Sequence, residues 1–279
     1  MNAEVRGERR TFADLRPRLI SSFVLAAVAL AVWGVGGVSF ALLWLAAGLA
    51  VLWEWQALLG EARHRARFLT GAAGLAIAAA FASYIALAVS CGALLVAAAL
   101  TMVIAERSRV IAGAGVLCAG ALVVCVIGLR QSDAFGPIAT AWLFALVWGT
   151  DVMAYFGGRL VGGPKLWPRV SAGKTWSGTL IGIFGGALIG LGVVALGTER
   201  APIVRLSLMG LLLAAISQAG DLAESALKRR FGVKDSGGLI PGHGGVMDRL
   251  DGFTAACVCA AVIGGLRQYP FIAAGLFSW

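Results

Sequence analysis

The stretch VIAGAGVLCAGALVVCVIGL, from Val110 to Leu129, decides the fold class of this chain. It holds no charged residue, and its length matches the roughly 20 apolar residues that a helix needs to cross a bilayer. Arg109 precedes the run and Arg130 follows it, so charge resumes where the apolar residues end. The pattern predicts a membrane-spanning helix.

Apolar runs of this kind recur along the whole chain. Its composition is 59% apolar and 13% charged, whereas about a quarter of the residues in an average soluble protein are charged. We therefore predict an all-α, polytopic integral membrane protein with about nine transmembrane helices. The candidate helices cover 19–33, 38–59, 68–89, 92–105, 110–129, 138–156, 179–197, 203–220 and 252–266. The first run is interpreted as a retained anchor rather than a cleaved signal, because a second run follows it at once.

No long polar segment separates the runs, so a single membrane domain over residues 1–279 is expected. Gly178, Gly182 and Gly186 recur at a spacing of four residues inside one run. Small residues at this spacing are typical of transmembrane helices that pack closely. We interpret these glycines as a packing face.

The net charge of +9 comes from lysines and arginines in short connections rather than from one basic stripe. This distribution argues against nucleic acid as a partner and favours lipid headgroups and phosphates. Every second connection is basic, and cytoplasmic loops are the ones that carry such an excess. We predict that the N-terminus and the loops 157–178 and 228–251 are cytoplasmic, while 130–137 and 198–205 face outward.

Two carboxylates lie inside apolar runs, where ionisable side chains are functional candidates. Glu54 stands between Trp53 and Trp55, and it is either functional or simply close to a helix end. Asp151 lies deeper, two helical turns before Arg159. An ion pair that ties two helices together is the alternative to a functional role for Asp151.

The richest segment is SQAGDLAESALKRRFGVKDSGGLIPGHGGVMDRLDG, residues 217–252. Four of its polar residues fall at i, i+3, i+4 and i+7, which places them on one face of a helix: Asp221, Glu224, Ser225 and Lys228. Basic residues and then glycines follow, and Asp248 and Asp251 close the segment three residues apart.

This mixture is what a metal and polyphosphate site requires. Carboxylates bind hard cations such as Mg²⁺, lysine and arginine neutralise phosphate oxygens, and glycines let backbone N–H groups approach them. A solvated charged loop would explain the basic residues by loop placement alone, but it leaves the carboxylates unexplained. The segment therefore predicts the functional site.

The stretch from Ser225 to Asp251 resembles the signature of the phosphatidate cytidylyltransferases. The matching positions are Ser225, Lys228, Arg229, Lys234, Asp235, Pro241, His243, Gly244, Gly245, Asp248, Arg249 and Asp251. A second cytoplasmic segment of that family is similar to Asp151, Ala154, Tyr155, Gly158, Arg159, Ser171, Lys174, Thr175 and Gly178. There Ala172, Gly173 and Ser177 depart from the usual SPKKT-x-EG form. The first 135 residues carry only a general resemblance.

The resemblance implies an enzyme that transfers the cytidylyl group of CTP to phosphatidate, giving CDP-diacylglycerol and pyrophosphate in phospholipid biosynthesis. It implies a bacterial-type inner membrane, with residues 1–135 mainly as scaffold and 136–252 as the catalytic part. One or two Mg²⁺ ions are expected, bound first by Asp221 and Asp248 and then by Asp251 and Glu224. A homodimer is left open.

The expected roles of the remaining site residues follow from the same resemblance. Lys228, Arg229, Lys234 and Arg249 would hold phosphates, with Lys228 and Arg229 beside the catalytic aspartates Asp221, Asp248 and Asp251. Ser171, Lys174 and Arg159 would contact the nucleotide or the lipid phosphate. His243 would donate a hydrogen bond to a phosphate or to the glycine-rich bend, since a phosphate nucleophile needs no general base.

Two other functions stay open, namely a CTP-dependent polyprenol or phytol kinase and a cation-coupled transporter. The charge gathers at one edge rather than at mid-bilayer in two related halves, which argues against the transporter. Two partial motifs are set aside. Gly173, Lys174 and Thr175 resemble the end of a P-loop, but Pro168 replaces the required glycine and no strand is expected there. DRLDG, from Asp248, resembles the CDP-alcohol phosphatidyltransferases, whose pattern needs an arginine at position 256 and further aspartates downstream.

Overall fold

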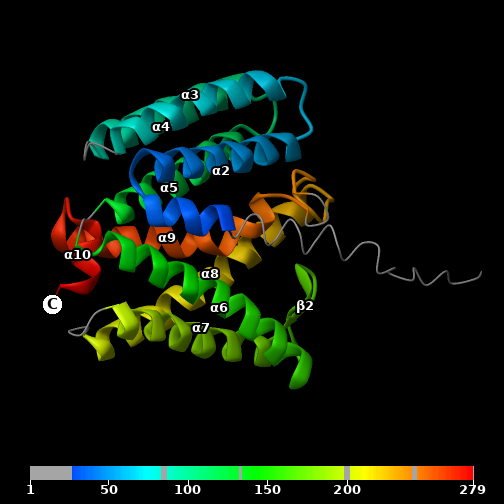
Figure 1. The fold of residues 1–279 in the computed structure, drawn as a ribbon. Helices are drawn as coiled ribbons and strands as arrows, with labels where there is room; N and C mark the ends of the chain where they lie inside the picture. Colours follow the sequence, from blue (N-terminus) through cyan, green and yellow to red (C-terminus); the bar gives the residue numbers. More distant parts are fainter. Residues whose placement is uncertain (1–26, 83–86, 132–133, 198–201, 241–243, 279) are drawn as a thin grey trace, which may run out of the picture.

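A computed structural model describes residues 27–82, 87–131, 134–197, 202–240 and 244–278 of the chain. These residues form a bundle of long, roughly parallel or antiparallel helices (Figure 1). Eight of the helices are long and apolar enough to cross a membrane. The prediction of an all-α, polytopic membrane protein is confirmed.

Most helices begin and end close to the predicted runs, but residues 87–89, predicted as the end of the third run, belong to the next helix. Their bounds are α2 Gly37–Leu58, α3 His64–Ala82, α4 Leu87–Ile104, α5 Arg109–Arg130, α6 Gly136–Leu160, α7 Trp176–Gly197, α8 Ile203–Arg230, α9 Met247–Gln268 and α10 Ile272–Phe277. Residues 27–35 are also helical, and the rest of the first candidate helix lies outside the described residues. The short α10 was not predicted, because six residues are too few for the apolar pattern to register.

The bundle has two groups of helices (Figure 1). Helices α2 to α5 pack on one another, with α3 and α4 outermost, and α6 to α9 form the other group. Contacts of α9 with α5 and α2 join the two groups. Helix α5 is the most enclosed span: 61% of the residues in its 18-residue apolar stretch are buried, against 28% in the corresponding stretch of α7. The uncharged run from Val110 to Leu129 is therefore the most buried span of the bundle.

The close contact of α6 with α7 depends on the glycine face. A Cβ atom at Gly178 would lie 2.7 Å from the carbonyl oxygen of Ala154, and one at Gly182 would lie 2.8 Å from that of Thr150. A Cβ at Gly186 would overlap the Thr150 hydroxyl. The interpretation of these glycines as a packing face is confirmed.

The connection between α6 and α7 corrects one expectation. No strand was expected near Lys174, but Lys165–Trp167 (β1) and Ser171–Thr175 (β2) form an antiparallel hairpin. The backbone then turns directly into α7, and the Thr175 hydroxyl accepts a hydrogen bond from Gly178 N at 3.1 Å. Thr175 is thus the N-cap of α7, a role that threonine commonly fills.

Helix α8 is longer than its predicted apolar span, which stopped at residue 220 because Asp221 ends the apolar run. The helix continues to Arg230, so the helical spacing predicted for Asp221 to Lys228 is confirmed. Pairs one turn apart stabilise the added turns: Ser225 donates to Asp221 at 3.3 Å, and Lys228 lies 3.1 Å from Glu224. The predicted loop from 228 to 251 is therefore shorter, from 231 to 246.

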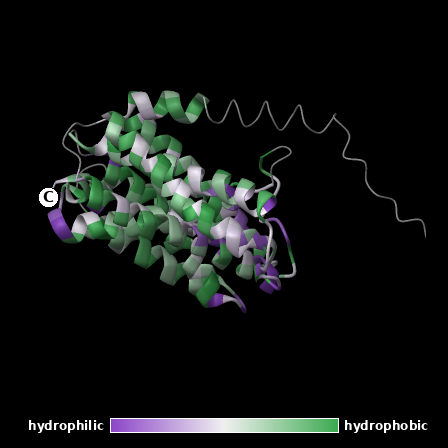
Figure 2. Cartoon of the chain, turned by 90° about the horizontal axis from the view of Figure 1, so that it is seen from below, coloured by the Kyte–Doolittle hydropathy of each residue, from purple (hydrophilic) through white to green (hydrophobic). Residues whose placement is uncertain are grey.

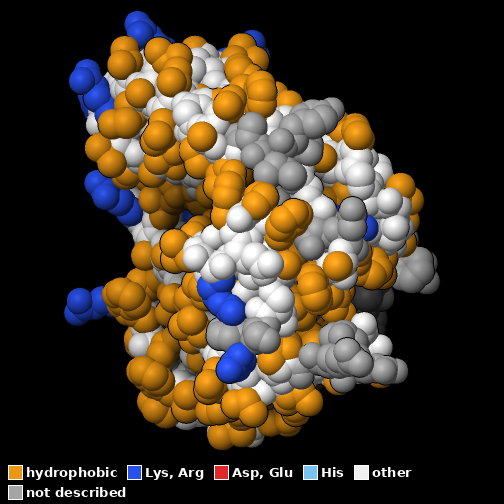
Figure 3. All heavy atoms as spheres, turned by 90° about the vertical axis from the view of Figure 1, so that its left-hand side faces the viewer, with side chains coloured by type: hydrophobic (Ala, Val, Ile, Leu, Met, Phe, Trp, Pro, Cys, Tyr) orange, Lys and Arg blue, Asp and Glu red, His pale blue; other side chains and the backbone are white. Residues whose placement is uncertain are grey.

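Hydrophilic segments gather at the end of the bundle that carries the α6–α7 and α8–α9 connections, away from the C-terminus (Figure 2). The opposite end shows mainly hydrophobic side chains with a few lysines or arginines, and no aspartate or glutamate among the described atoms visible on that face (Figure 3). The two long loops predicted to share one side of the membrane do lie at the same end (Figure 1).

Glu61, in the connection between α2 and α3, ties down the neighbouring connection between α4 and α5. Its carboxylate accepts hydrogen bonds from the backbone N–H groups of Glu106, Arg107 and Ser108, at 2.9, 3.3 and 2.9 Å. It also pairs with the buried Arg67 at 3.1 Å. Burial acts to raise the pKa of Glu61, but the three N–H groups and Arg67 outweigh it and lower the pKa below its ordinary value.

A carboxyl with a lowered pKa stabilises the fold above its ordinary pKa and loses that effect as the pH falls through the folded-state value. We predict that Glu61→Gln lowers the free energy of unfolding by about 2 kcal/mol at neutral pH. The difference from the unmodified protein should shrink below about pH 4. Thermal unfolding in detergent across that pH range measures it. The control is Glu106→Gln, which changes an exposed carboxylate in the α4–α5 connection. An equal loss of stability in that variant would contradict the prediction.

Candidate active site

A polar pocket of about 690 Å³ opens at the end of the bundle where the hydrophilic segments gather. It lies between α6, α8, α9 and the β-hairpin. Four aspartates and three cations line it: Asp151, Asp221, Asp248, Asp251, Lys174, Arg159 and Arg249. The structure thus brings together most of the site residues predicted from two distant parts of the sequence.

Lys174 connects the hairpin to α8. Its ammonium group lies 2.6 Å from an oxygen of Asp221 and donates to the Gln218 side chain at 3.1 Å. The amide of Gln218 in turn donates to Asp151 at 3.5 Å. Asp151 is therefore linked to α8 through the Gln218 amide, and the ion pair between two helices that the sequence left as an alternative is not its described contact. Arg159 instead contacts the hydroxyl and ring of Tyr155.

Lys228 makes the second link, between α8 and α9. Its ammonium group lies 2.5 Å from Asp248 and 3.1 Å from Glu224, and it is buried together with Glu224. Lys228 therefore neutralises carboxylates and does not line the polar pocket.

Asp248 is held on all sides. Besides Lys228, it accepts hydrogen bonds from Ser236 N at 3.1 and 3.2 Å and from Gly245 N at 3.0 Å. A carboxylate in the first turn of α9 also compensates the positive end of the helix dipole. Asp248 thus fixes the loop before α9 as well as lining the pocket. Asp251, one turn further along α9, accepts a hydrogen bond from Gly252 N at 2.7 Å.

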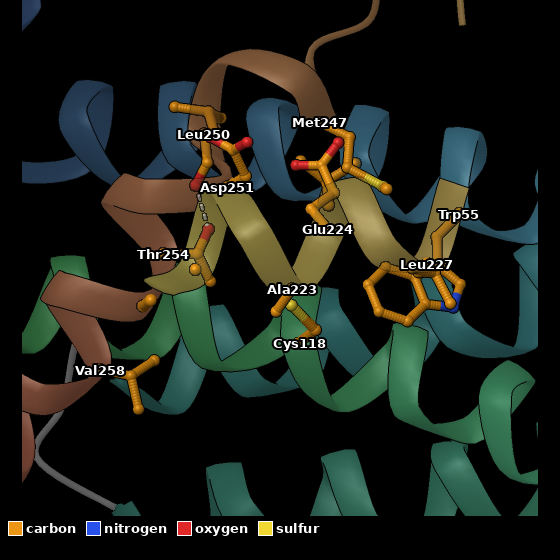
Figure 4. A pocket seen from close by; sticks show the side chains of 13 residues that line it. Trp55, Cys118, Ala223, Glu224, Leu227, Met247, Leu250, Asp251, Thr254 and Val258 are labelled. Carbon is orange, nitrogen blue, oxygen red and sulfur yellow. Dashed lines mark hydrogen bonds between the residues drawn. The ribbon is translucent and has the colours of Figure 1, made fainter. Parts of the chain in front are cut away.

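An apolar pocket of about 450 Å³ lies behind Glu224 and Asp251, between α8 and α9 on one side and α2 and α5 on the other (Figure 4). Trp55, Cys118, Leu227 and Val258 are among its walls. Asp251 lines both pockets, so the polar and the apolar spaces meet at this side chain.

Several predicted site residues lie elsewhere. Ser171 and the exposed Lys234 are outside the lining of the polar pocket. Arg229 donates to the carbonyl oxygens of Val170 and Val233, and so fastens the hairpin to the end of α8. His243 lies outside the described residues.

Two polar residues that the sequence analysis did not select belong to the site. Gln218 lies three residues before Asp221 on the same helical face, so the periodicity that selected Asp221 could also have selected it. Ser236 connects to Asp248 through its backbone and to Glu54 through its hydroxyl. No periodic signal marks it, because it sits in an irregular loop.

The carboxylates of the polar pocket are oxygen donors suited to a hard cation. Among the described residues, no three His, Cys, Asp or Glu side chains converge closely enough to form a complete metal site. Proteins that bind Mg²⁺ together with a phosphate substrate often supply only one or two carboxylates, and substrate phosphates and water complete the coordination shell. Asp221 and Asp251, from facing helices, fit that arrangement.

Fold and site together define a multi-pass membrane protein with a polar pocket, lined by aspartates, lysine and arginines, at one end of its helices. Residues 16–266 match the sequence profile of the cytidylyltransferase family. The phosphatidate cytidylyltransferase of Brucella abortus is 39% identical over 277 residues, covering 95% of this chain and 98% of its own. Those of Bacillus subtilis and Pseudomonas aeruginosa are 40% and 43% identical over 127 and 124 residues, covering 46% and 43% of this chain and 47% and 46% of their own.

The chain belongs to the cytidylyltransferase family. The resemblance seen in residues 225–251 is confirmed, and it extends over nearly the whole length of the protein.

Proposed function

We propose that this protein transfers the cytidylyl group of CTP to phosphatidate, giving CDP-diacylglycerol and pyrophosphate, in a bacterial plasma membrane. The observation that carries the proposal is the polar pocket, in which Lys174, Arg159 and Arg249 face four aspartates where the spanning helices meet the hydrophilic end. Relatives named phosphatidate cytidylyltransferase support the same reaction. A homodimer stays an expectation.

In this reaction an oxygen of the phosphatidate phosphate forms a bond to the α-phosphorus of CTP, and the bond from that phosphorus to the pyrophosphate oxygen breaks. The nucleophile is already anionic near neutral pH, so no side chain has to remove a proton. The protein must instead bring two anions together and stabilise charge on the leaving pyrophosphate. Lys174, Arg159 and Arg249 supply the positive charge on the pocket wall.

Mg²⁺ is the proposed cofactor, with Asp221 and Asp251 as ligands and Asp248 close by. A bound divalent cation neutralises phosphate oxygens that the aspartates would otherwise repel. Glu224 and Lys228 take a supporting role, because the two are buried behind the pocket wall. The apolar pocket that adjoins Asp251 offers a place for hydrocarbon, which a lipid substrate has and a soluble one lacks.

The assay for this proposal follows label from CTP. Label in the cytosine ring or the α-phosphate should enter the lipid fraction only when phosphatidate and a divalent metal are present, while γ-label should leave as pyrophosphate. Thin-layer separation of the purified protein's products measures both. Transfer of the γ-label to lipid would contradict the proposal and favour a CTP-dependent kinase.

We also propose that the end with the polar pocket faces the cytoplasm, where CTP is found. In a cysteine-free background, Gly238→Cys lies in the exposed α8–α9 loop and Ala134→Cys is exposed at the other end. An impermeant thiol reagent on intact cells should label Ala134→Cys, and it should label Gly238→Cys only after permeabilisation. The reverse pattern would invert the orientation.

Asp248 and Asp235 separate a half-buried carboxylate with several hydrogen-bond donors from an exposed one in the same motif. Asp248→Asn removes the charge that pairs with Lys228, so activity should fall by about 100-fold or more in correctly inserted protein. Asp235→Asn, at an exposed position, should lower activity by less than about 10-fold. Steady-state rates per folded molecule measure both. Equal, mild losses would remove Asp248 from the machinery of the reaction.

A further inference from the structure

Glu54 is a buried carboxylate of α2, with 2% of its surface exposed, and it lines neither pocket. It accepts hydrogen bonds from Val246 N at 3.0 Å, Met247 N at 2.8 Å and the Ser236 hydroxyl at 3.0 Å. These donors are more than 180 residues away in the sequence. A side chain from the first group of helices therefore holds the start of α9, in the second group.

The first turn of a helix leaves N–H groups without partners inside the helix. Three consecutive N–H groups at and just before the start of α9 have carboxylate partners: Gly245 N donates to Asp248, and the N–H groups of Val246, the N-cap residue, and Met247 donate to Glu54. Ser236 joins the same two carboxylates, since its N–H donates to Asp248 and its hydroxyl to Glu54. Glu54 and Asp248 thus accept hydrogen bonds from the same backbone turn, residues 245–247, and from the same serine, Ser236.

The glycines of this loop make room for the Glu54 side chain. A Cβ atom at Gly237 would lie 2.6 Å from one Glu54 oxygen, and a Cβ at Gly245 would lie 2.5 Å from the other. The Gly245 Cβ would also collide with the Ser236 hydroxyl. The backbone wraps the carboxylate so closely that any side chain at either glycine would displace it.

We propose that Glu54 is a positioning residue for the reaction. It fixes the first turn of α9, and through that turn it fixes the directions in which Asp248, Arg249 and, one turn later, Asp251 point. The inference rests on the proposed function for its activity readout. Without Glu54, the 236–247 segment and the aspartates of α9 shift relative to Lys174 and Asp221, which are held from the hairpin and α8.

Glu61 supplies a matched control. It too is a glutamate of the first group that accepts three hydrogen bonds, but its donors are all backbone N–H groups of the α4–α5 connection rather than groups around the start of α9. Glu54→Gln should lower kcat by about 10- to 100-fold, while the KM for CTP changes by less than about threefold. Glu61→Gln should lose stability and keep kcat per folded molecule.

Hydrogen exchange gives a readout that needs no turnover. In Glu54→Gln the amides of residues 244–247 should exchange faster and those of 106–108 should not, and Glu61→Gln should show the reverse. If the unmodified protein transfers no cytidylyl group, the proposed function fails, and the exchange arm still tests the link from Glu54 to α9. An unchanged kcat in folded Glu54→Gln would overturn the proposal, as would equal kcat losses in the two variants.

Ser236→Ala keeps the proposal testable if Glu54→Gln does not insert. It removes one of the three hydrogen bonds of Glu54 and leaves the backbone contacts, so kcat should fall by about 3- to 10-fold. Where both variants fold, the double variant should lose less than the product of the single losses, because the two side chains act through one contact. Fully multiplicative losses, or a Ser236→Ala protein with the kcat of the unmodified chain, would overturn the proposal.

Discussion

Lys228 is the constraint on which the arrangement of the site depends. One ammonium group faces Asp248 on α9 and Glu224 on its own helix, at 2.5 and 3.1 Å. Removing one partner of a buried charge pair leaves the other charge unpaired, which is far less favourable than keeping the pair. The end of α8 and the start of α9 are therefore held in register by electrostatics as well as by packing. Lys174 does the same between the hairpin and α8 through Asp221.

Glycine packing and charge pairing act on opposite sides of the site. The glycine face of α7 lets α6 approach, which carries Asp151 toward α8. The ion pairs then set the side-chain directions at the hydrophilic end. Four aspartate carboxylates in one pocket repel one another, and the repulsion is stronger where little water screens it. The three cationic side chains on the same walls oppose that repulsion. The polar pocket is stable because its charges are mixed.

The sequence alone was sufficient for the fold class and for much of the pocket. Periodicity and composition predicted the spanning helices, and the i, i+3, i+4, i+7 pattern placed Asp221, Glu224, Ser225 and Lys228 on one helical face, where the structure shows Lys228 paired with Glu224 and Ser225 bonded to Asp221. The hairpin could not be predicted, because Lys165–Trp167 and Ser171–Thr175 are too short and too polar for a period of two to show. The apolar pattern alone ended at residue 220, and the spacing of the polar residues from Asp221 to Lys228 predicted the helical turns that follow, which the structure extends to Arg230.

Long-range hydrogen bonds are the part that no local pattern contains. Glu54 and Glu61 are seven residues apart, both are glutamates near the end of α2, and both accept three hydrogen bonds from distant segments. What separates them is the identity of those segments: one is the connection between α4 and α5, and the other opens the helix that carries Asp248 and Asp251. A buried carboxylate at the end of a spanning helix needs hydrogen-bond donors, and the tertiary fold determines which backbone turn supplies them. Its contribution to the site follows from that turn rather than from the residue itself, so it can be assigned only once α2 and α9 are seen side by side (Figure 1).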